Sequence, residues 1–192
     1  HAKINLALAV GPPQSPSGYH PICSWFAPLD LFDDVTVTPA PQSSFSLDWA
    51  PDAPRTSPID WPAEKDLARR AHLAFEAALG RPCTASISVS KRIPVGGGLG
   101  GASTNAAAVL RALRELFAPH LTEHDLVAIA TKLGSDVAYF CDTAGPVPRH
   151  AIVEGLGERI EHTEAVGGAA LLVVPPFGCA TRDVYQAFDS AP

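Results

Sequence analysis

The chain has 192 residues, 46% of them hydrophobic and 18% charged, and its formal net charge is -6. That length supports one good hydrophobic core, or one domain and part of another. Basic runs are no longer than two residues, which argues against nucleic acid or an anionic membrane as the main partner, and no run approaches the roughly 20 apolar residues that cross a bilayer. We therefore expect a cytoplasmic protein in which an anionic small ligand would need a local positive pocket.

The four cysteines are widely separated, without Cys-x-x-Cys spacing and without paired histidines beside them. They are Cys23, Cys83, Cys141 and Cys179. This pattern favours buried thiols over a disulfide framework or a zinc site, and no set of protein metal ligands is predicted. The sequence also lacks methionine and opens inside a predicted strand, so we expect the chain to be part of a longer polypeptide.

The first predicted element is a strand over residues 2–10. One side carries Ile4, Leu6, Leu8 and Val10, and the other carries Lys3, Asn5, Ala7 and Ala9. This two-residue period is typical of a half-buried strand, and it places Lys3 and Asn5 on one face. A loop rich in glycine, proline and serine follows, and then an apolar stretch. Two alternating segments, 35–39 and 45–49, predict two strands joined by a short connection.

Helices and strands alternate in the middle of the chain. Apolar spacing predicts a helix that begins at Asp66 and ends before Gly80. Residues 85–90 predict a strand that leads into a glycine-rich loop, and a helix with an apolar face begins near Ser103. Thr122 and Asp125 stand in the relation of a capping box at the start of another helix. A further short helix would begin at Ser135 and carry Asp136.

The last part of the chain predicts a second domain. Strands are expected over 150–155 and 158–164, another strand over 167–176, and a helix from 181 onward. We place a domain boundary near Val166 to Gly168, so that residues 1–166 form one domain and residues 167–192 begin an incomplete second one.

The stretch 91–110 has five glycines around one leucine at the start of a helix: KRIPVGGGLGGASTNAAAVL. Glycines adopt positive φ and allow several backbone N–H groups to face one oxyanion. At a helix start these donors add to the partial positive charge of the helix. The loop therefore predicts a phosphate site.

Other interpretations of the loop make demands that this sequence does not meet well. A Walker A loop needs a lysine directly after its last glycine, but Ala102 and Ser103 follow Gly101. The spacing Gly-x-Gly-x-x-Gly is present, but Pro94 precedes it, and a helix cap stands where a dinucleotide fold expects an acidic residue. A structural turn that binds nothing remains an alternative.

Four segments in order resemble one family: AKINLAL, GYHPICSWFAPLDLFDD, PVGGGLGGASTNAA and LGSDVAYF. Together they resemble the GHMP kinases. The resemblance implies an α+β, two-domain architecture, in which an N-terminal α/β domain with a mixed sheet is followed by a ferredoxin-like α/β domain, here truncated. Within the family it favours the kinases of the non-mevalonate isoprenoid pathway. A homoserine or mevalonate type of kinase, a nucleotide-binding module without catalysis and a nicotinamide-dependent oxidoreductase are the alternatives.

The resemblance also implies a site. ATP would be the phosphate donor, accompanied by Mg2+, and the acceptor would be a cytidine-diphosphate-linked sugar alcohol. Lys3 and Asp136 would be the catalytic pair, because a carboxylate can orient or deprotonate a hydroxyl while an ammonium balances the developing charge. Taken singly, each residue is explained better by structure, Lys3 as an edge-strand lysine and Asp136 as a helix-start carboxylate, and catalysis is favoured only for the two together in their motifs.

The remaining site residues follow from the same resemblance. The ATP-binding set is Pro94, Val95, Gly96, Gly97, Gly98, Leu99, Gly100, Gly101, Ala102, Ser103 and Thr104. The substrate-binding set is Asn5, Tyr19, His20, Asn105 and Thr181. Ser103, Thr104 and Asp136 are candidates to hold Mg2+ together with phosphates and water. Asp66 stands where the family resemblance leads us to expect an asparagine near the adenine.

Overall fold

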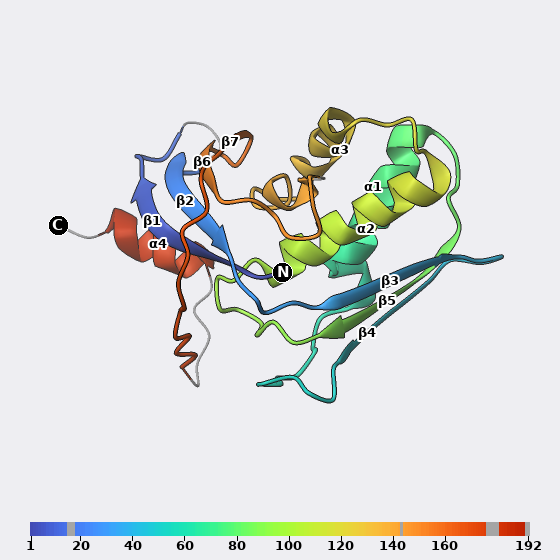
Figure 1. Cartoon of the computed structure of the whole chain (residues 1–192), viewed down its shortest axis with the longest axis horizontal. Coiled ribbons are helices and arrows are strands. Elements are labelled where there is room, and N and C mark those ends of the chain that lie inside the picture. Colours follow the sequence, from blue (N-terminus) through green and yellow to red (C-terminus); the bar gives the residue numbers. More distant parts are fainter. Residues whose placement is uncertain (15–17, 143, 176–180, 191–192) are drawn as a thin grey trace.

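The structure is a computed structural model that describes residues 1–14, 18–142, 144–175 and 181–190. Two β-sheets with helices packed on them give the α+β class predicted from the sequence (Figure 1). The strands are β1 (Lys3–Val10), β2 (Ile22–Pro28), β3 (Asp34–Pro39), β4 (Ser44–Trp49), β5 (Ala85–Lys91), β6 (Ala151–Gly155) and β7 (Arg159–His162). The helices are α1 (Leu67–Leu79), α2 (Gly101–Phe117), α3 (Glu123–Ala130) and α4 (Thr181–Asp189), with short 3-10 helices η1 (Ala63–Lys65) and η2 (Tyr139–Cys141).

The four-stranded sheet has the order β1-β2-β6-β7, and each pair of neighbouring strands in it is antiparallel. β1 is its edge strand, and its register with β2 shifts between Asn5 and Ala7. The strand itself was predicted, and so was the shared face of Lys3 and Asn5, since Lys3 Nζ donates to Asn5 Oδ1 at 2.8 Å. The predicted half-buried face is covered only in part: Ile4 packs against a small core cluster, but Leu6 and Leu8 are 43% and 51% exposed. Alternation fixes which side chains share a face, but it does not fix whether that face is covered.

The three-stranded sheet has the order β3-β5-β4 and is mixed, because β5 runs antiparallel to β3 and parallel to β4. The two strands that a short connection joins are therefore not paired with each other. β5 lies between them and carries Ile87 and Val89, each 1% exposed, toward the core. A central strand with two apolar residues that are fully buried explains why both outer strands pair with it.

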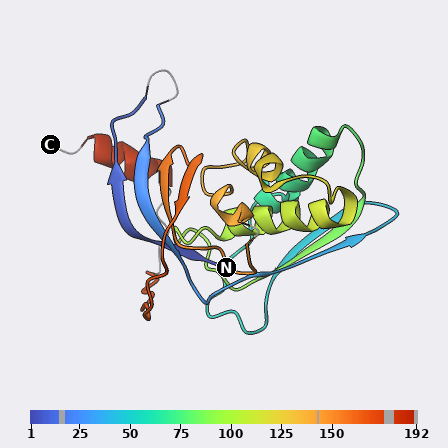
Figure 2. The same cartoon turned by 45° about the horizontal axis from the view of Figure 1, so that its top comes forward.

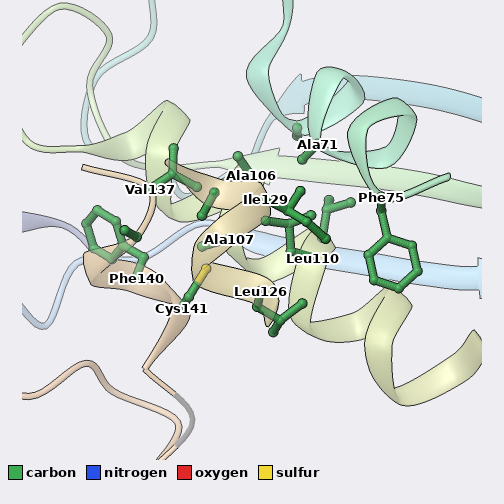
Figure 3. Close-up of a cluster of buried hydrophobic side chains, with 14 of the residues drawn as sticks. Ala71, Phe75, Ala106, Ala107, Leu110, Leu126, Ile129, Val137, Phe140 and Cys141 are labelled. Atoms are coloured by element: carbon green, nitrogen blue, oxygen red, sulfur yellow. The ribbon is translucent and has the colours of Figure 1, made fainter. Parts of the chain in front are cut away.

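Helices cover one face of this mixed sheet. Figure 2 shows α1 and α2 above the three strands, with the four-stranded sheet and α4 at the other end of the molecule. The close-up in Figure 3 labels Ala71, Phe75, Ala106, Ala107, Leu110, Leu126, Ile129, Val137, Phe140 and Cys141. Fully burying one large apolar side chain stabilises a fold by about 1.5–3 kcal/mol, so this cluster holds α1, α2, α3 and η2 together.

The helix signals were predicted well where they depend on neighbouring residues. Asp66 caps α1, with its side chain accepting from the N–H of Ala68, and Gly80 ends the helix in the left-handed conformation at φ 65°. Thr122 and Asp125 form the predicted capping box of α3. α2 begins at Gly101, two residues before the predicted start near Ser103. α4 occupies the predicted last helix.

Two predicted elements are wrong. Asp136 lies in a turn that leads into η2, and not in a helix capped by Ser135. Residues 167–175 form neither helix nor strand. Leu171 and Val173 in that segment are 92% and 82% exposed, so the apolar pattern that suggested a strand is not buried there. The proposed domain boundary near residue 167 stays a prediction.

Two of the cysteines are buried as predicted, Cys83 and Cys141, and burial raises the pKa of the Cys141 thiol to about 12. Cys23 is exposed, contrary to the prediction, because it lies on the opposite face of β2 from the buried Ser24. Cys179 falls outside the described residues. Within the described part of the chain, no helix is both long and apolar enough to cross a membrane, and no cluster of three histidine, cysteine or acidic side chains could hold a metal ion.

Candidate active site

The glycine-rich loop leads directly into α2, and no side chain caps the N-terminus of that helix. Gly100 is the N-cap residue, at φ 74°. Thr104 N donates to Gly100 O at 2.8 Å, so the first helical hydrogen bond leaves the preceding N–H groups without a helical partner. Gly96 and Gly98 also have positive φ, a conformation that suits glycine. A 17-residue helix that begins in this way offers N–H donors and a partial positive charge to an anion.

A cavity of about 210 Å³ lies over this helix start. Every predicted ATP-binding residue from Pro94 to Ser103 lines it, and so does Asn105, which was predicted to bind the acceptor. Thr104 is 7% exposed and lines a different cavity, together with Asp33 and Arg111. The loop thus brings together ten of the eleven residues of the predicted ATP-binding set, together with Asn105.

Leu47, Trp61 and Asp66 form a second wall of the same cavity. Trp61 Nε1 donates to Asp66 Oδ2 at 3.0 Å, and Asp66 Oδ1 accepts from Ala68 N at 2.9 Å. The indole and the carboxylate are therefore held in fixed positions beside the loop. Sequence reasoning placed Asp66 near a base but missed Trp61, because its proline-rich surroundings showed no periodicity.

Lys91 is a cation in the wall of the cavity that sequence reasoning left without a role. It is the last residue of β5 and is 4% exposed. A Cβ built on Gly101 would lie 3.6 Å from its Nζ, so the ammonium stands at the start of α2. This ammonium is paired with the Asp33 carboxylate at 2.6 Å, so it stands at the helix start as one member of a buried ion pair.

Lys3 and Asp136 come together beside the loop, with Lys3 Nζ 3.4 Å from Asp136 Oδ2. The lysine side chain is 6% exposed and the aspartate side chain 25% exposed. Lys3 N donates to Leu99 O at 2.9 Å, so the first strand is joined directly to the glycine loop, and in Figure 1 the N-terminus lies near the start of α2. Asn5, the third predicted residue of this group, accepts the hydrogen bond from Lys3 described above.

This pair has the chemistry of a proton-transfer site. The ammonium of Lys3 also lies 4.5 Å from the ring centroid of Phe26, a cation–π contact that holds it in place. The carboxylate is the more accessible member of the pair, so it is the group that an incoming hydroxyl can reach. An ammonium beside a carboxylate can stabilise negative charge that develops on such a hydroxyl or on a transferred phosphate.

His20 connects the loop that follows β1 to α4. Its Nδ1 lies 2.8 Å from Gly11 O, and its Nε2 lies 3.3 Å from Asp189 Oδ2. The rings of Tyr185 and Phe188 are 5.0 and 6.2 Å from the His20 ring, centroid to centroid. Aromatic side chains from two distant segments therefore gather at one place.

The other predicted acceptor residues are less enclosed. Tyr19, next to His20, is 68% exposed. Thr181 begins α4, and its side chain lies outside the described part of the structure. Tyr185 was missed from the sequence, although an aromatic residue one helical turn after Thr181 would share a helix face with it.

Comparison with known proteins places this geometry in a family. Residues 66–143 match the model described as the GHMP kinases N terminal domain. The 4-diphosphocytidyl-2-C-methyl-D-erythritol kinase of Clostridium botulinum (strain Alaska E43 / Type E3) is 35% identical over 190 residues, which is 98% of this chain and 63% of that protein. The kinase of the same name from Anaeromyxobacter sp. (strain Fw109-5) is 41% identical over 174 residues, 91% of this chain and 53% of that protein.

Among solved structures, a crystal structure of 4-(cytidine 5'-diphospho)-2C-methyl-D-erythritol kinase matches with a TM-score of 0.70 and 33% identity. The match covers 97% of this chain and 62% of that one. The chain thus spans between 53% and 63% of the length of these relatives. The fold, the glycine loop at a helix start and these matches lead to one assignment: residues 66–143 carry the GHMP kinases N-terminal domain, and the chain as a whole is similar to kinases of that family.

Proposed function

We propose that the protein containing this chain transfers the terminal phosphate of ATP to the 2-hydroxyl of 4-diphosphocytidyl-2-C-methyl-D-erythritol. The observation that carries the proposal is the ion pair of Lys3 and Asp136 beside an open helix N-terminus. The relatives that match nearly the whole chain bear the name of this activity. The first strand, the glycine loop and the turn before η2 together supply the groups that a phosphoryl transfer to an alcohol needs.

ATP would lie with its phosphates on the glycine loop and its adenine toward Trp61 and Leu47. Mg2+ bound together with ATP would supply positive charge that neutralises the phosphates. Ser103, which lines the cavity, and Asp136 are the side chains that would contact it. Since no three acidic, histidine or cysteine side chains cluster among the described residues, phosphates and water would complete its coordination.

In the proposed reaction the acceptor hydroxyl approaches Asp136, which orients it and takes its proton. The hydroxyl oxygen forms a bond to the terminal phosphorus, the bond from that phosphorus to the bridging oxygen breaks, and ADP leaves. Lys3 stabilises the negative charge on the attacking oxygen and on the transferred group. Asn5, held by Lys3, would position the acceptor alcohol, and the reaction would take place in the cytoplasm.

His20, Tyr19 and Tyr185 would bind the cytosine, with Asn105 and Thr181 as the remaining proposed acceptor contacts. Stacking of a base on an aromatic side chain is worth about 1–3 kcal/mol, which is enough to favour a cytidine-linked acceptor. The contact between His20 and the Tyr185 ring supports this placement, because it joins two aromatic groups from opposite ends of the chain.

The proposal predicts ATP-dependent phosphorylation of 4-diphosphocytidyl-2-C-methyl-D-erythritol by the protein that contains this chain. Formation of ADP and of the phosphorylated acceptor, followed together by coupled absorbance and phosphorus NMR, measures it. Homoserine and mevalonate are expected to remain unphosphorylated under the same conditions. Phosphorylation of either in preference to the cytidine compound would contradict the assignment, and ATP binding without any turnover would leave a nucleotide-binding module.

His20→Ala is expected to raise the KM for the cytidine acceptor about tenfold or more, because one stacking partner of the base is lost. The KM for ATP should not change, since His20 is not among the residues that line the cavity over the start of α2, where the phosphates would bind; we call it the phosphate cavity. Steady-state kinetics with each substrate varied in turn gives both constants. His124→Ala, an exposed histidine on α3, is the matched control and should alter neither. Equal changes in the two constants would argue against a base-binding role.

A further inference from the structure

Asp33 is a buried carboxylate with a full set of hydrogen bonds. Its side chain is 0% exposed. Oδ1 accepts from the backbone N–H groups of Arg92 and Ile93 at 2.6 and 2.7 Å. Oδ2 accepts from Lys91 Nζ at 2.6 Å and from Asn105 Nδ2 at 2.8 Å. A carboxylate has about four acceptor sites, so this one is fully used.

The four donors come from both sides of the glycine loop in the sequence. Lys91 ends the strand that leads into the glycine loop, and Arg92 and Ile93 begin the loop itself. Asn105 belongs to the first turns of α2, on the other side of the glycines. One side chain, which precedes β3, therefore holds both ends of the loop, and two of its partners, Lys91 and Asn105, line the cavity.

The ion pair also decides the charge of the cavity wall. A lysine that is 4% exposed would be costly to keep as an ammonium without a partner. Asp33 supplies that partner and fixes the Nζ position through a short, charge-assisted hydrogen bond. The ammonium stays beside the N-terminus of α2, where an anionic ligand would meet it.

We propose that Asp33 is a positioning residue for the phosphates of ATP, acting through Lys91 and through the backbone at the entrance to the glycine loop. It does not touch the ligand itself. The identity of the ligand as ATP rests on the proposed function. The role of Asp33 in holding Lys91 and the loop backbone in place does not.

Two aspartates in the same chain provide matched controls. Asp34, the next residue, also pairs with Arg92, at 2.7 Å from its Nη1, but its side chain is 57% exposed. Asp142 is 3% exposed and accepts one hydrogen bond from Ala144 and three from Arg149. Burial would raise the pKa of Asp142, but these hydrogen bonds outweigh burial and lower it to about 2. Asp142 thus resembles Asp33 in burial and in hydrogen bonding but is not among the residues that line the phosphate cavity.

The test compares Asp33→Asn, Asp34→Asn and Asp142→Asn in the whole protein. Binding of N-methylanthraniloyl-ATP, followed by energy transfer from Trp61 in the cavity wall, gives the Kd. Asp33→Asn is expected to weaken this binding about 10-fold to 100-fold, the value of a hydrogen bond to a charged group. Asp34→Asn should bind as the wild type does, and Asp142→Asn should lose thermal stability without losing nucleotide affinity.

Amide hydrogen exchange supplies a readout that needs no nucleotide. Faster exchange confined to residues 92–105 in Asp33→Asn is expected, and exchange identical to the wild type there would overturn the proposal. If the wild type binds no ATP, the proposed function fails, and exchange alone decides the positioning role.

A double variant covers the case in which Asp33→Asn does not fold. Asp33→Asn with Lys91→Met replaces the buried ion pair by neutral groups, which is often tolerated by the fold. It is expected to fold and still to bind nucleotide weakly. Wild-type affinity in this double variant, or equal loss of affinity in Asp33→Asn and Asp142→Asn, would overturn the proposal.

Discussion

Lys3→Ala and Asp136→Asn are each expected to lower kcat by roughly two to four orders of magnitude. Their Nζ and Oδ2 atoms are 3.4 Å apart, and each group acts on the acceptor hydroxyl in the proposed reaction. The nucleotide, measured without Mg2+, should still bind, because neither residue is among those that line the cavity over the start of α2. Rapid-quench measurement of the phosphorylated acceptor, together with the Kd of a fluorescent ATP, separates the chemical step from binding.

Lys132→Ala removes an exposed lysine elsewhere and should leave kcat unchanged. Circular dichroism of each variant shows whether the fold persists. Rates near the wild type in both Lys3→Ala and Asp136→Asn would exclude the pair as catalytic groups, whereas a loss of ATP affinity in step with kcat would assign them a structural role at the loop.

Gly100→Ala is expected to reduce both thermal stability and kcat. Gly100 has φ 74°, where a residue with a Cβ costs about 1–2 kcal/mol. A Cβ there would also lie 2.9 Å from two ring carbons of Phe140 and 3.1 Å from Cγ of Lys3. Either the ring or the lysine must move, and a movement of the lysine would displace the ammonium that we propose as a catalytic group. Differential scanning calorimetry and initial rates measure the two effects.

The same loop contains two internal controls. Gly97 lacks positive φ, and its Cβ would meet Leu99 carbons at an ordinary 3.5 Å, so Gly97→Ala should be nearly neutral. Gly98 has φ 68° but open space around it, so Gly98→Ala should show backbone strain alone. The expected order of effect is Gly97, Gly98, Gly100. An effect of Gly97→Ala as large as that of Gly100→Ala would show that the contacts with Phe140 and Lys3 are unimportant.

The parts of the fold that follow from nearby residues were predictable. The caps of α1 and α3 depend on Asp66 and on the Thr122–Asp125 pair, each of which acts within one helical turn. The open helix start at Gly100 follows from a cluster of glycines before an apolar helix face. The fold class and the family were also predicted, because four segments in order resemble one family and the comparisons confirm it.

Features that depend on distant residues were not predictable in this way. The position of β5 between β3 and β4 is decided by which strand buries Ile87 and Val89, and the short connection between β3 and β4 does not indicate it. The apolar pattern of the sequence does not predict that Leu6 and Leu171 are exposed to solvent. The bond from Lys91 to Asp33 joins residues 58 positions apart, and no spacing rule relates them.

The hydrogen bond from Lys3 N to Leu99 O ties the backbone of the first strand to the backbone of the glycine loop. Leu99 itself is 7% exposed and packs with Ala2 and Ile93, so its carbonyl cannot rotate away freely. A displacement of the glycine loop therefore carries the backbone of Lys3 with it. In the proposed site, this one backbone bond would keep the distance between a phosphate on the loop and the Lys3 ammonium nearly constant, even when the whole segment shifts.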